Sequence, residues 1–441
     1  MRWAFLGTAV AIGVSAPVQA QDSDVAPTVA VKPAVAVAPM PAADSNVAPF
    51  YSAHPGTLVW LRDEGTRAAA AKLVPILKRA PIDGLGDGPK LASSVETAVA
   101  GGTAADDQII STAWVRYVQA LKRPVQGVSF GDPALRLKQQ SASAILSDAA
   151  AAPSLAAHVD AVASPNPLYS ALRDAALAGG QQSDPHVVAT LDRLRLIPGK
   201  GRAILVDVAN AQLSMLEDGK TIDTMKVIVG KPDFPTPLLA GTIWYVTYNP
   251  YWHIPQDVAK RKVAPIVIKR GVSYLKAARY QTVGGFGGEK EAPIDPASID
   301  WKAVAAGDAE VTIRQLSGPN NMMGKMKFGF ANDYGIFLHD TPHKELFAKA
   351  KRTLSLGCVR VERPPELAQW LMGHEPDVPG DDSEENVRIG KQGVPIYISY
   401  LTARPDGATI AFTDDVYKLD GASGGGSKAV AVAATPATAE K

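Results

Sequence analysis

The sequence predicts a multidomain chain of the α+β class, with a helical N-terminal domain followed by a β-rich domain. Three observations support this prediction. Apolar residues recur at helical spacing between about residues 50 and 200, the period changes to two at about Ala203, and stretches rich in Ala, Val, Pro or Gly flank the two parts. We therefore expect a helical domain at 49–195 and a β-rich domain at 196–420.

The first half of the chain carries repeated signals of amphipathic helices. The segment "TRAAAAKLVPILKRA" places Leu73, Ile76 and Leu77 on one face, with Thr66 as the expected N-cap. In "NPLYSALRDAALAGG", Asn166 is the expected cap and the next residue, a proline, takes the first helical position. A third segment, 106–122, repeats the apolar spacing with Ile109, Ile110, Trp114, Tyr117 and Leu121. This half shows no paired carboxylates, metal-ligand spacing or phosphate-binding loop.

The second half is predicted to consist mainly of strands. Asp218 and Gly219 stand between two alternating runs, which is a strong short-range signal of a β-hairpin. Further strands are expected at "AILVDVA", "GTIWYVTYN", "AEVTIRQL", "YGIFLH" and "PIYISYL". Helical interruptions are expected near 257–270, 343–350 and 364–372.

The N-terminus predicts export. Arg2 precedes an apolar run that is too short to span a bilayer, and "VQA" ends at Ala20, where we expect signal peptidase to cleave. No second apolar run of spanning length follows. Residues 21–48 and 421–441 have the composition of a flexible linker and a disordered tail. A formal net charge of +1 gives no electrostatic reason to expect nucleic acid or an anionic membrane as a partner.

Cys358 is the only cysteine in 441 residues, so it is either buried and inert or reactive. A nucleophilic thiol needs a base and donors for an oxyanion. Gly357 permits a tight turn that would bring the N–H groups of Leu356, Gly357 and Cys358 to one point. Arg360 would face the same side in an extended backbone, where it could lower the thiol pKa or hold a substrate carboxylate.

Among the seven histidines, His339 is the strongest candidate for the base. It ends the apolar stretch "YGIFL" and enters the turn "HDTPH", and a strand end is a rigid mount for a catalytic side chain. His253 and His343 are intermediate candidates. His339, Asp340 and Cys358 do not have a recognisable zinc spacing, so no metal and no other cofactor is expected.

The residues around this pair resemble the signature of the L,D-transpeptidase catalytic domain of the YkuD type. That family combines an H-x-x-P turn with a downstream S-x-G-C-h-R or S-x-G-C-h-N segment, and this sequence has His339 to Pro342 and then Ser355 to Arg360. The sequence also resembles the larger YcbB-like branch of that family in the segments "LDRLRLIPG", "YNPYWHIP", "MGKMKFGF" and "FTDDVYKLD". The resemblance covers about 190–420 well, whereas 50–180 is similar to that branch's N-terminal scaffold only in layout.

The resemblance implies a catalytic domain built as a mixed β-sandwich or barrel, and a cysteine acyltransferase that works in the periplasm. Cys358 would attack the third residue of a peptidoglycan stem tetrapeptide, release D-alanine and form a thioester. His339 would carry the proton, oriented by the backbone carbonyl of Asp340. The amine of an acceptor stem would then resolve the thioester into a 3–3 crosslink. Carbapenem-type inhibitors and other wall-synthesis proteins are further partners that the resemblance implies.

The same resemblance assigns weaker roles to other residues. Arg360 would position the donor stem, and Ser355 would order the turn. Trp252 either lines the donor cleft or belongs to a core, since a buried tryptophan needs no functional reason. Residues 256–310 form either a mobile flap over the site or a surface insertion.

Two features depart from the family's pattern. Leu356 stands where members often carry histidine or serine, so a side-chain donor is lost there. In addition, "LAGGQQSDPHVVATLDRLRLIPG" leads directly from the helical domain to the catalytic domain, which leaves no room for the peptidoglycan-binding module of many YcbB-like members.

Two other functions remain open at this stage. With water as acceptor, the same fold would act as an L,D-carboxypeptidase or as a hydrolase of diamino-acid linkages. Alternatively, the chain is a non-catalytic wall-binding protein with Cys358 as a buried small hydrophobe.

Overall fold

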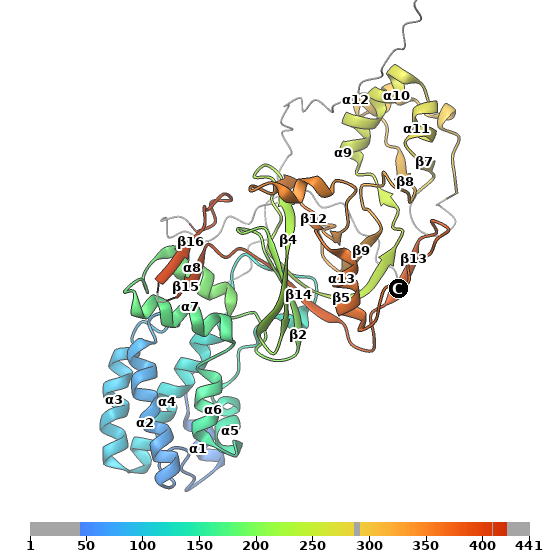
Figure 1. Cartoon of the computed structure of the whole chain (residues 1–441). Coiled ribbons are helices and arrows are strands. Elements are labelled where there is room, and N and C mark those ends of the chain that lie inside the picture. Colours follow the sequence, from blue (N-terminus) through green and yellow to red (C-terminus); the bar gives the residue numbers. More distant parts are fainter. Residues whose placement is uncertain (1–44, 286–291, 408, 421–441) are drawn as a thin grey trace, which may run out of the picture.

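The structure is a computed structural model that describes residues 45–285, 292–407 and 409–420 (Figure 1). The expected signal peptide at 1–20, nearly all of the expected linker at 21–48 and the expected tail at 421–441 lie outside the described residues. Within the described part, a helical region is followed by a β-rich region, so the predicted fold class is confirmed.

The helical region forms a bundle at one end of the molecule (Figure 1). Two further helices link it to the β-rich region. The elements are α1 (Ala48–Ala53), α2 (Glu64–Arg79), α3 (Gly88–Gly101), α4 (Ala104–Leu121), β1 (Ser129–Phe130), η1 (Pro133–Leu135), α5 (Ala142–Ala151), α6 (Leu155–Val162), α7 (Pro167–Ala178) and α8 (Pro185–Leu194).

Local sequence explains where these helices begin. Helix α7 starts as predicted, with Asn166 accepting a hydrogen bond from the Tyr169 N–H and a proline at the first position. The N-cap predicted for α2 was wrong. Asp63 is the N-cap, and Thr66 is the third helical residue of a capping box, because each side chain accepts a hydrogen bond from the other residue's N–H. Ile109 was also predicted to be on the apolar face of α4, but it is 44% exposed.

Most strands of the β-rich region form one mixed sheet that closes on itself. Its path is β5–β14–β2–β3–β4–β12–β10–β9, and β9 pairs back with β5, so eight strands make a closed barrel. The β14–β2 and β10–β12 pairs are parallel, and the other pairs around the barrel are antiparallel. The strands β1, β11 and β13 join at its edges.

The elements of the barrel follow in chain order. They are β2 (Arg202–Asp207), β3 (Gln212–Glu217), β4 (Lys220–Gly230), β5 (Leu239–Tyr248), β9 (Met326–Phe330), β10 (Leu338–His339), η5 (Lys344–Ala348), β11 (Thr353–Ser355), β12 (Val359–Val361), α13 (Pro364–Met372), β13 (Glu385–Arg388) and β14 (Val394–Ser399). The predicted hairpin is confirmed, because Asp218 and Gly219 join β3 to β4, both with positive φ.

A small lobe interrupts the barrel between β5 and β9. It contains β6 (Trp252–His253), α9 (Gln256–Val258), the π-helical turn η2 (Ala259–Val263), α10 (Ala264–Arg270), α11 (Ser273–Ala277), β7 (Tyr280–Val283), η4 (Pro296–Ser298), α12 (Trp301–Ala306) and β8 (Thr312–Gln315). Its three strands form a separate sheet in the order β6–β8–β7. The lobe has an apolar core of its own, which includes Val263, Val267 and Ile313.

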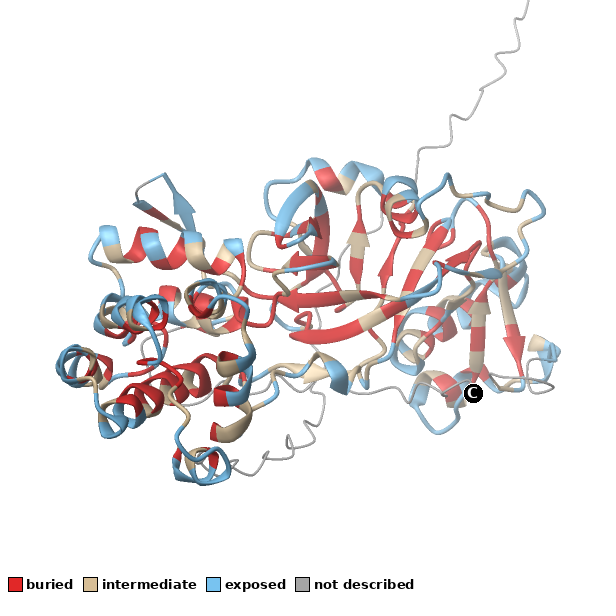
Figure 2. Ribbon diagram, turned by 90° about the horizontal axis from the view of Figure 1, so that it is seen from below, coloured by how far each residue is buried: buried red, intermediate tan, exposed pale blue. Residues whose placement is uncertain are grey.

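The apolar core of the helical region continues onto the barrel. Side chains such as Leu205, Leu216 and Tyr397 from the barrel belong to the same cluster as the buried faces of the helices. A C-terminal hairpin, β15 (Ala403–Asp406) and β16 (Thr409–Phe412), packs on α7 and α8. Figure 2 shows this distribution, with buried residues along the strands and the inward helix faces. None of the helices in the described residues combines the length and apolar character that a membrane crossing requires.

Candidate active site

The register of β9, β10 and β12 brings the predicted base and nucleophile into one neighbourhood. His339 on β10 pairs with Arg360 on β12 and with Lys327 on β9. Residues that are directly opposite in neighbouring strands project to the same face of the sheet. Cys358 precedes Arg360 by two residues, so an extended backbone puts both side chains on this face as well. The adjacent positions in the register, such as Leu338 and Val359, are fully buried in the barrel core.

His339 is held in one orientation by the chain itself. Its side chain is only 5% exposed, and its Nδ1 lies 2.5 Å from the backbone oxygen of Asp340. A carbonyl oxygen can only accept a hydrogen bond, so Nδ1 carries the hydrogen and Nε2 of the neutral ring is left as the basic atom. This is the contact that the resemblance implied for Asp340.

The carboxylate of Asp340 has a different task. One oxygen accepts hydrogen bonds from the Thr341 N–H and from the Lys344 ammonium at 2.5 Å, and the other accepts from the Lys325 N–H at 2.8 Å. These bonds tie the turn after β10 to the strand β9. The side chain therefore fixes the position of the carbonyl that orients His339.

Cys358 is partly exposed, and backbone groups surround its sulfur. The Cys358 Sγ lies 3.7 Å from the backbone oxygen of Gly335, and the Phe337 N–H donates to it from the residue two positions before His339. Burial raises the pKa of the thiol, against the opposing effects of the Phe337 N–H and of the cations Arg360 and Lys327. The thiol is thus protonated at neutral pH.

The imidazole is neutral at the same pH. Burial, which has the largest effect, and the nearby cations Arg360 and Lys327 together lower the pKa of His339 to about 4, while the hydrogen bond to the Asp340 carbonyl acts in the opposite direction. The same two cations, Arg360 and Lys327, lower the pKa of both side chains. At rest, therefore, a protonated thiol and a neutral imidazole lie in one region of the structure.

A tight turn presents the nucleophile. Ser355 Oγ accepts a hydrogen bond from the Gly357 N–H at 3.1 Å and donates to the Cys358 carbonyl at 2.6 Å. Gly357 has φ of +121°, and a Cβ there would also approach Ile336 to 3.2 Å, so the turn requires glycine. Because the Gly357 N–H is engaged in the turn, the N–H groups of Leu356 and Cys358 are the ones that have no protein acceptor within the described residues.

Residues that the sequence analysis missed support this turn from behind. Thr236 Oγ1 donates to the Gly357 carbonyl at 2.7 Å and accepts from the Gly230 N–H at 2.9 Å. The Tyr417 hydroxyl donates to the Gly230 carbonyl and accepts from the Thr236 N–H. Tyr417 lies in the segment "FTDDVYKLD", whose resemblance to the YcbB-like branch was the signal that could have found it.

The other predicted site residues occupy three different settings. Arg360 is partly buried, and its Nε has no hydrogen-bond partner within the described part of the chain. Leu356 is 56% exposed beside the nucleophile. Trp252 is partly buried against the core of the small lobe, on a sheet separate from the barrel. The structure therefore brings His339, Asp340 and the 355–360 segment together, and it places Trp252 on a different element.

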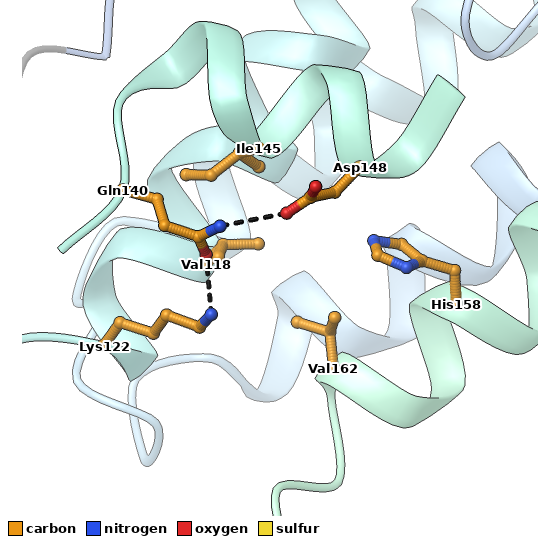
Figure 3. Close-up of a pocket in the computed structure, with 7 residues that line it drawn as sticks. All are labelled: Val118, Lys122, Gln140, Ile145, Asp148, His158 and Val162. Carbon is orange, nitrogen blue, oxygen red and sulfur yellow. Dashed lines mark hydrogen bonds between the residues drawn. The ribbon is translucent and has the colours of Figure 1, made fainter. Parts of the chain in front are cut away.

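No other feature competes with this site. The described residues contain no group of three or more His, Cys, Asp or Glu side chains that could hold a metal ion. A small cavity of about 60 Å³ lies between α4, α5 and α6, where Gln140 bridges Lys122 and Asp148 beside His158 (Figure 3). None of the predicted site residues lines that cavity.

Comparisons with known proteins assign both regions. Residues 201–398 match the family model described as YkuD, the L,D-transpeptidase catalytic domain, and residues 45–175 match the model described as the Scaffold domain. A Haemophilus influenzae protein named as an L,D-transpeptidase is 30% identical over 235 residues, which are 52% of this chain and 46% of that protein. The chain therefore spans about half the length of this curated relative.

Two solved structures show a weaker likeness. An L,D-transpeptidase from Mycobacterium smegmatis is 15% identical over 46% of this chain and 59% of that chain, with a TM-score of 0.23. The catalytic domain of an E. faecium L,D-transpeptidase, acylated by ertapenem, is 11% identical over 45% of this chain and 98% of that chain, with a TM-score of 0.21. Values this low carry no structural weight, so the assignment depends on the family models and the sequence relative.

By these matches, the chain carries a domain of the L,D-transpeptidase catalytic (YkuD) type behind a domain of the Scaffold type. Residues 176–200 lie between the two matched ranges and hold little more than α8, which is consistent with the predicted lack of a peptidoglycan-binding module.

Proposed function

We propose that this chain forms 3–3 peptidoglycan crosslinks through a thioester on Cys358. One observation carries the proposal. The strands β10 and β12 are neighbours, and the same two cations, Arg360 and Lys327, affect both His339 and Cys358. The imidazole Nδ1 is hydrogen-bonded to the Asp340 carbonyl. This arrangement suits a thiol that loses its proton to Nε2 during attack.

The reaction has two halves. In the first, the Cys358 sulfur bonds to the carbonyl carbon of the third residue of a donor tetrapeptide, and its proton passes to His339. The bond to the terminal D-alanine then breaks, and the leaving amine takes that proton. In the second half, the side-chain amine of an acceptor stem attacks the thioester. The attacking amine gives up a proton to His339, the carbon–sulfur bond breaks as the new amide forms the 3–3 link, and the sulfur takes that proton from His339.

The turn at 355–358 supplies the electrostatic part of catalysis. The N–H groups of Leu356 and Cys358 are the candidate donors to the tetrahedral oxyanion. Loss of one such donor typically costs about 3 kcal/mol of transition-state stabilisation. Arg360 would hold a carboxylate of the donor stem near the sulfur, and Ser355 would keep the turn in shape. Trp252 would contact the donor from the lobe side.

The test is product analysis on the natural polymer. Tetrapeptide-rich sacculi are incubated with the wild-type protein and with Cys358→Ala, and the muropeptides are separated and weighed. We expect 3–3 crosslinked dimers and free D-alanine from the wild type alone. Tripeptides without dimers would identify water as the acceptor and replace the transpeptidase proposal with a carboxypeptidase. The absence of any product and of any mass adduct on Cys358 would refute both enzymatic functions.

The same chemistry predicts an inhibitor class and a location. A carbapenem presents a strained carbonyl to the sulfur, so we expect one adduct on Cys358 by intact mass and none on Cys358→Ala. Peptidoglycan as substrate requires the periplasm, in agreement with the export signal expected at residues 1–20.

A further inference from the structure

One segment of the small lobe has a strong excess of positive charge. Residues 256–283 contain seven Lys or Arg and one Asp, although the whole chain has a formal net charge of only +1. Two of the seven have local partners. Arg279 forms an ion pair with Asp382, and the Lys260 ammonium lies against Gly307 at the end of α12.

The other five cations are exposed and have no ion-pair partner among the residues that the structure describes. Arg261, Lys262, Lys269, Arg270 and Lys276 all have exposed side chains. Within the described residues, none of the five has an ion-pair partner or a side-chain hydrogen bond. Apolar side chains stand among them, because Ile268 is 46% exposed and Val272 is 37% exposed. These five cations, together with Ile268 and Val272, are called the basic lobe surface.

The opposite side of the same helices fixes this surface in place. Val263, Val267 and Leu275 are at most 3% exposed and belong to the core of the lobe. The exposed residues are therefore displayed by an anchored, amphipathic pair of helices. In Figure 1, α10 and α11 lie at the end of the molecule away from the scaffold helices, where a large partner can reach them.

We propose that the basic lobe surface binds an anionic phospholipid bilayer. Long cationic side chains with no fixed partner suit a fluid array of headgroups, and aliphatic side chains between them can enter the headgroup region. Polybasic segments are drawn to anionic leaflets over about one Debye length, about 10 Å at 0.1 M salt. Binding would hold the enzyme beside the membrane while the barrel stays outside it.

The alternative partner is a glycan strand, which the surface fits less well. Sugar rings are commonly bound on flat aromatic faces, but the tyrosines of this segment are occupied. Tyr274 and Tyr280 contact each other edge to face, with ring centroids 6.1 Å apart, and both are partly buried. The exposed apolar groups here are aliphatic, which favours lipid.

The experiment is sedimentation of the full-length mature protein with vesicles. Vesicles of phosphatidylcholine alone are compared with vesicles that contain roughly a third phosphatidylglycerol. We expect binding to the anionic vesicles only, and its loss between about 0.1 M and about 1 M salt. Cys358→Ala is expected to bind like the wild type, so the result does not depend on the proposed reaction.

Matched variants locate the surface. The double variant K269E/R270E should lower the vesicle partition coefficient at least about tenfold. K90E/K138E makes the same change of charge on exposed residues of the scaffold and should leave binding near the wild-type level. I268S/V272S should weaken binding, whereas I109S/V188S, at two side chains that are each 44% exposed on the scaffold, should not.

Three results would overturn the proposal. The wild type could fail to sediment with anionic vesicles, or both charge-reversal variants could lose binding equally, which would reflect net charge alone. The third result is binding to sacculi, but not to vesicles, that K269E/R270E abolishes, which would make the surface a glycan site. Circular dichroism and carbapenem acylation confirm that each variant is folded.

Discussion

At the scale of single residues, the protonation states of His339 and Cys358 decide how the site works. Burial raises the thiol pKa and lowers the imidazole pKa to about 4, so both groups are neutral at neutral pH. A preformed thiolate–imidazolium pair would have the opposite order of pKa values. In the proposed reaction the proton would therefore be transferred during attack, and Arg360 and Lys327 would stabilise the charge on sulfur as it develops.

This predicts a particular pH profile for the thiol. We expect alkylation of Cys358 by iodoacetamide to rise steadily into the alkaline range, with no plateau around neutral pH. In R360Q, loss of the cation should raise the thiol pKa further, and each unit of that rise lowers the rate at a given lower pH about tenfold. The pKa of His339 should also rise, so the acid limit of acylation should move from near 4 to higher pH.

The control for this series is K351Q, at an exposed lysine outside the site. It should leave both limbs of the profile in place. A wild-type plateau at neutral pH would contradict the neutral pair and would indicate a resting thiolate.

The sequence was sufficient to propose Cys358 and His339 as a reacting pair but not to predict the residues around them. Cys358 and His339 stood out because there is one thiol and because one histidine ends an apolar strand. Lys327 could not be recognised, because its role comes from the β9–β10 register, which links it to His339 across a long loop. Nor could the use of the Gly357 N–H by Ser355 be predicted, since it depends on the shape of the turn.

At the scale of elements, three chain segments meet at the turn that carries Cys358. The loop after β4, the segment 355–358 and the stretch around Tyr417 meet through Thr236, which is 1% exposed. A buried hydroxyl that serves a donor and an acceptor at once cannot be replaced by an apolar group without leaving both unpaired.

We therefore predict that T236V slows acylation of Cys358 and destabilises the protein by about 1–3 kcal/mol. Thr190 offers a matched control, because it is also fully buried and its hydroxyl accepts the Ala403 N–H far from the turn. T190V should lose stability without slowing acylation. Stopped-flow acylation by a carbapenem, beside urea unfolding, separates the two effects. Equal slowing in both variants would show that Thr236 acts only through global stability.

Sequence patterns predicted some boundaries of helices and strands correctly and others not. The β3–β4 hairpin followed from Asp218 and Gly219, because a short turn with positive φ is encoded locally. The strand expected at "YGIFLH" is limited to Leu338–His339, since the residues before it are used in the loop that approaches Cys358. Tertiary contacts, which no local pattern records, set that limit.

At the scale of the whole molecule, the scaffold and the barrel share a buried ionic contact. Arg193 at the end of α8 donates to the Tyr400 carbonyl and to Oδ2 of Asp420 and forms an ion pair with Asp420 Oδ1, and all these groups are buried. The ring of Tyr400 stacks on Tyr417, with centroids 5.4 Å apart, and Tyr417 supports the turn behind the nucleophile. The contact therefore links the scaffold to the active site through the C-terminal segment.

Removal of one partner of the Arg193–Asp420 pair should lower the stability of the protein and should also affect the turn that carries Cys358. We predict that R193A lowers the free energy of unfolding by about 3–5 kcal/mol, because it leaves the Asp420 carboxylate buried without its partner. R193M/D420L, which removes both charges, should recover much of that loss. Breaking the exposed pair Lys72–Asp160 with K72A should cost less than about 1 kcal/mol.

The same variants distinguish a shared structure from two independent domains. If the C-terminal segment transmits the contact, R193A should slow carbapenem acylation of Cys358 even at temperatures where the protein remains folded, and the double variant should restore part of the rate. Calorimetry should then show one transition for the wild type and a separate, earlier scaffold transition for R193A. An unchanged acylation rate together with a loss of stability would mean that Arg193 joins the two regions without influencing the turn.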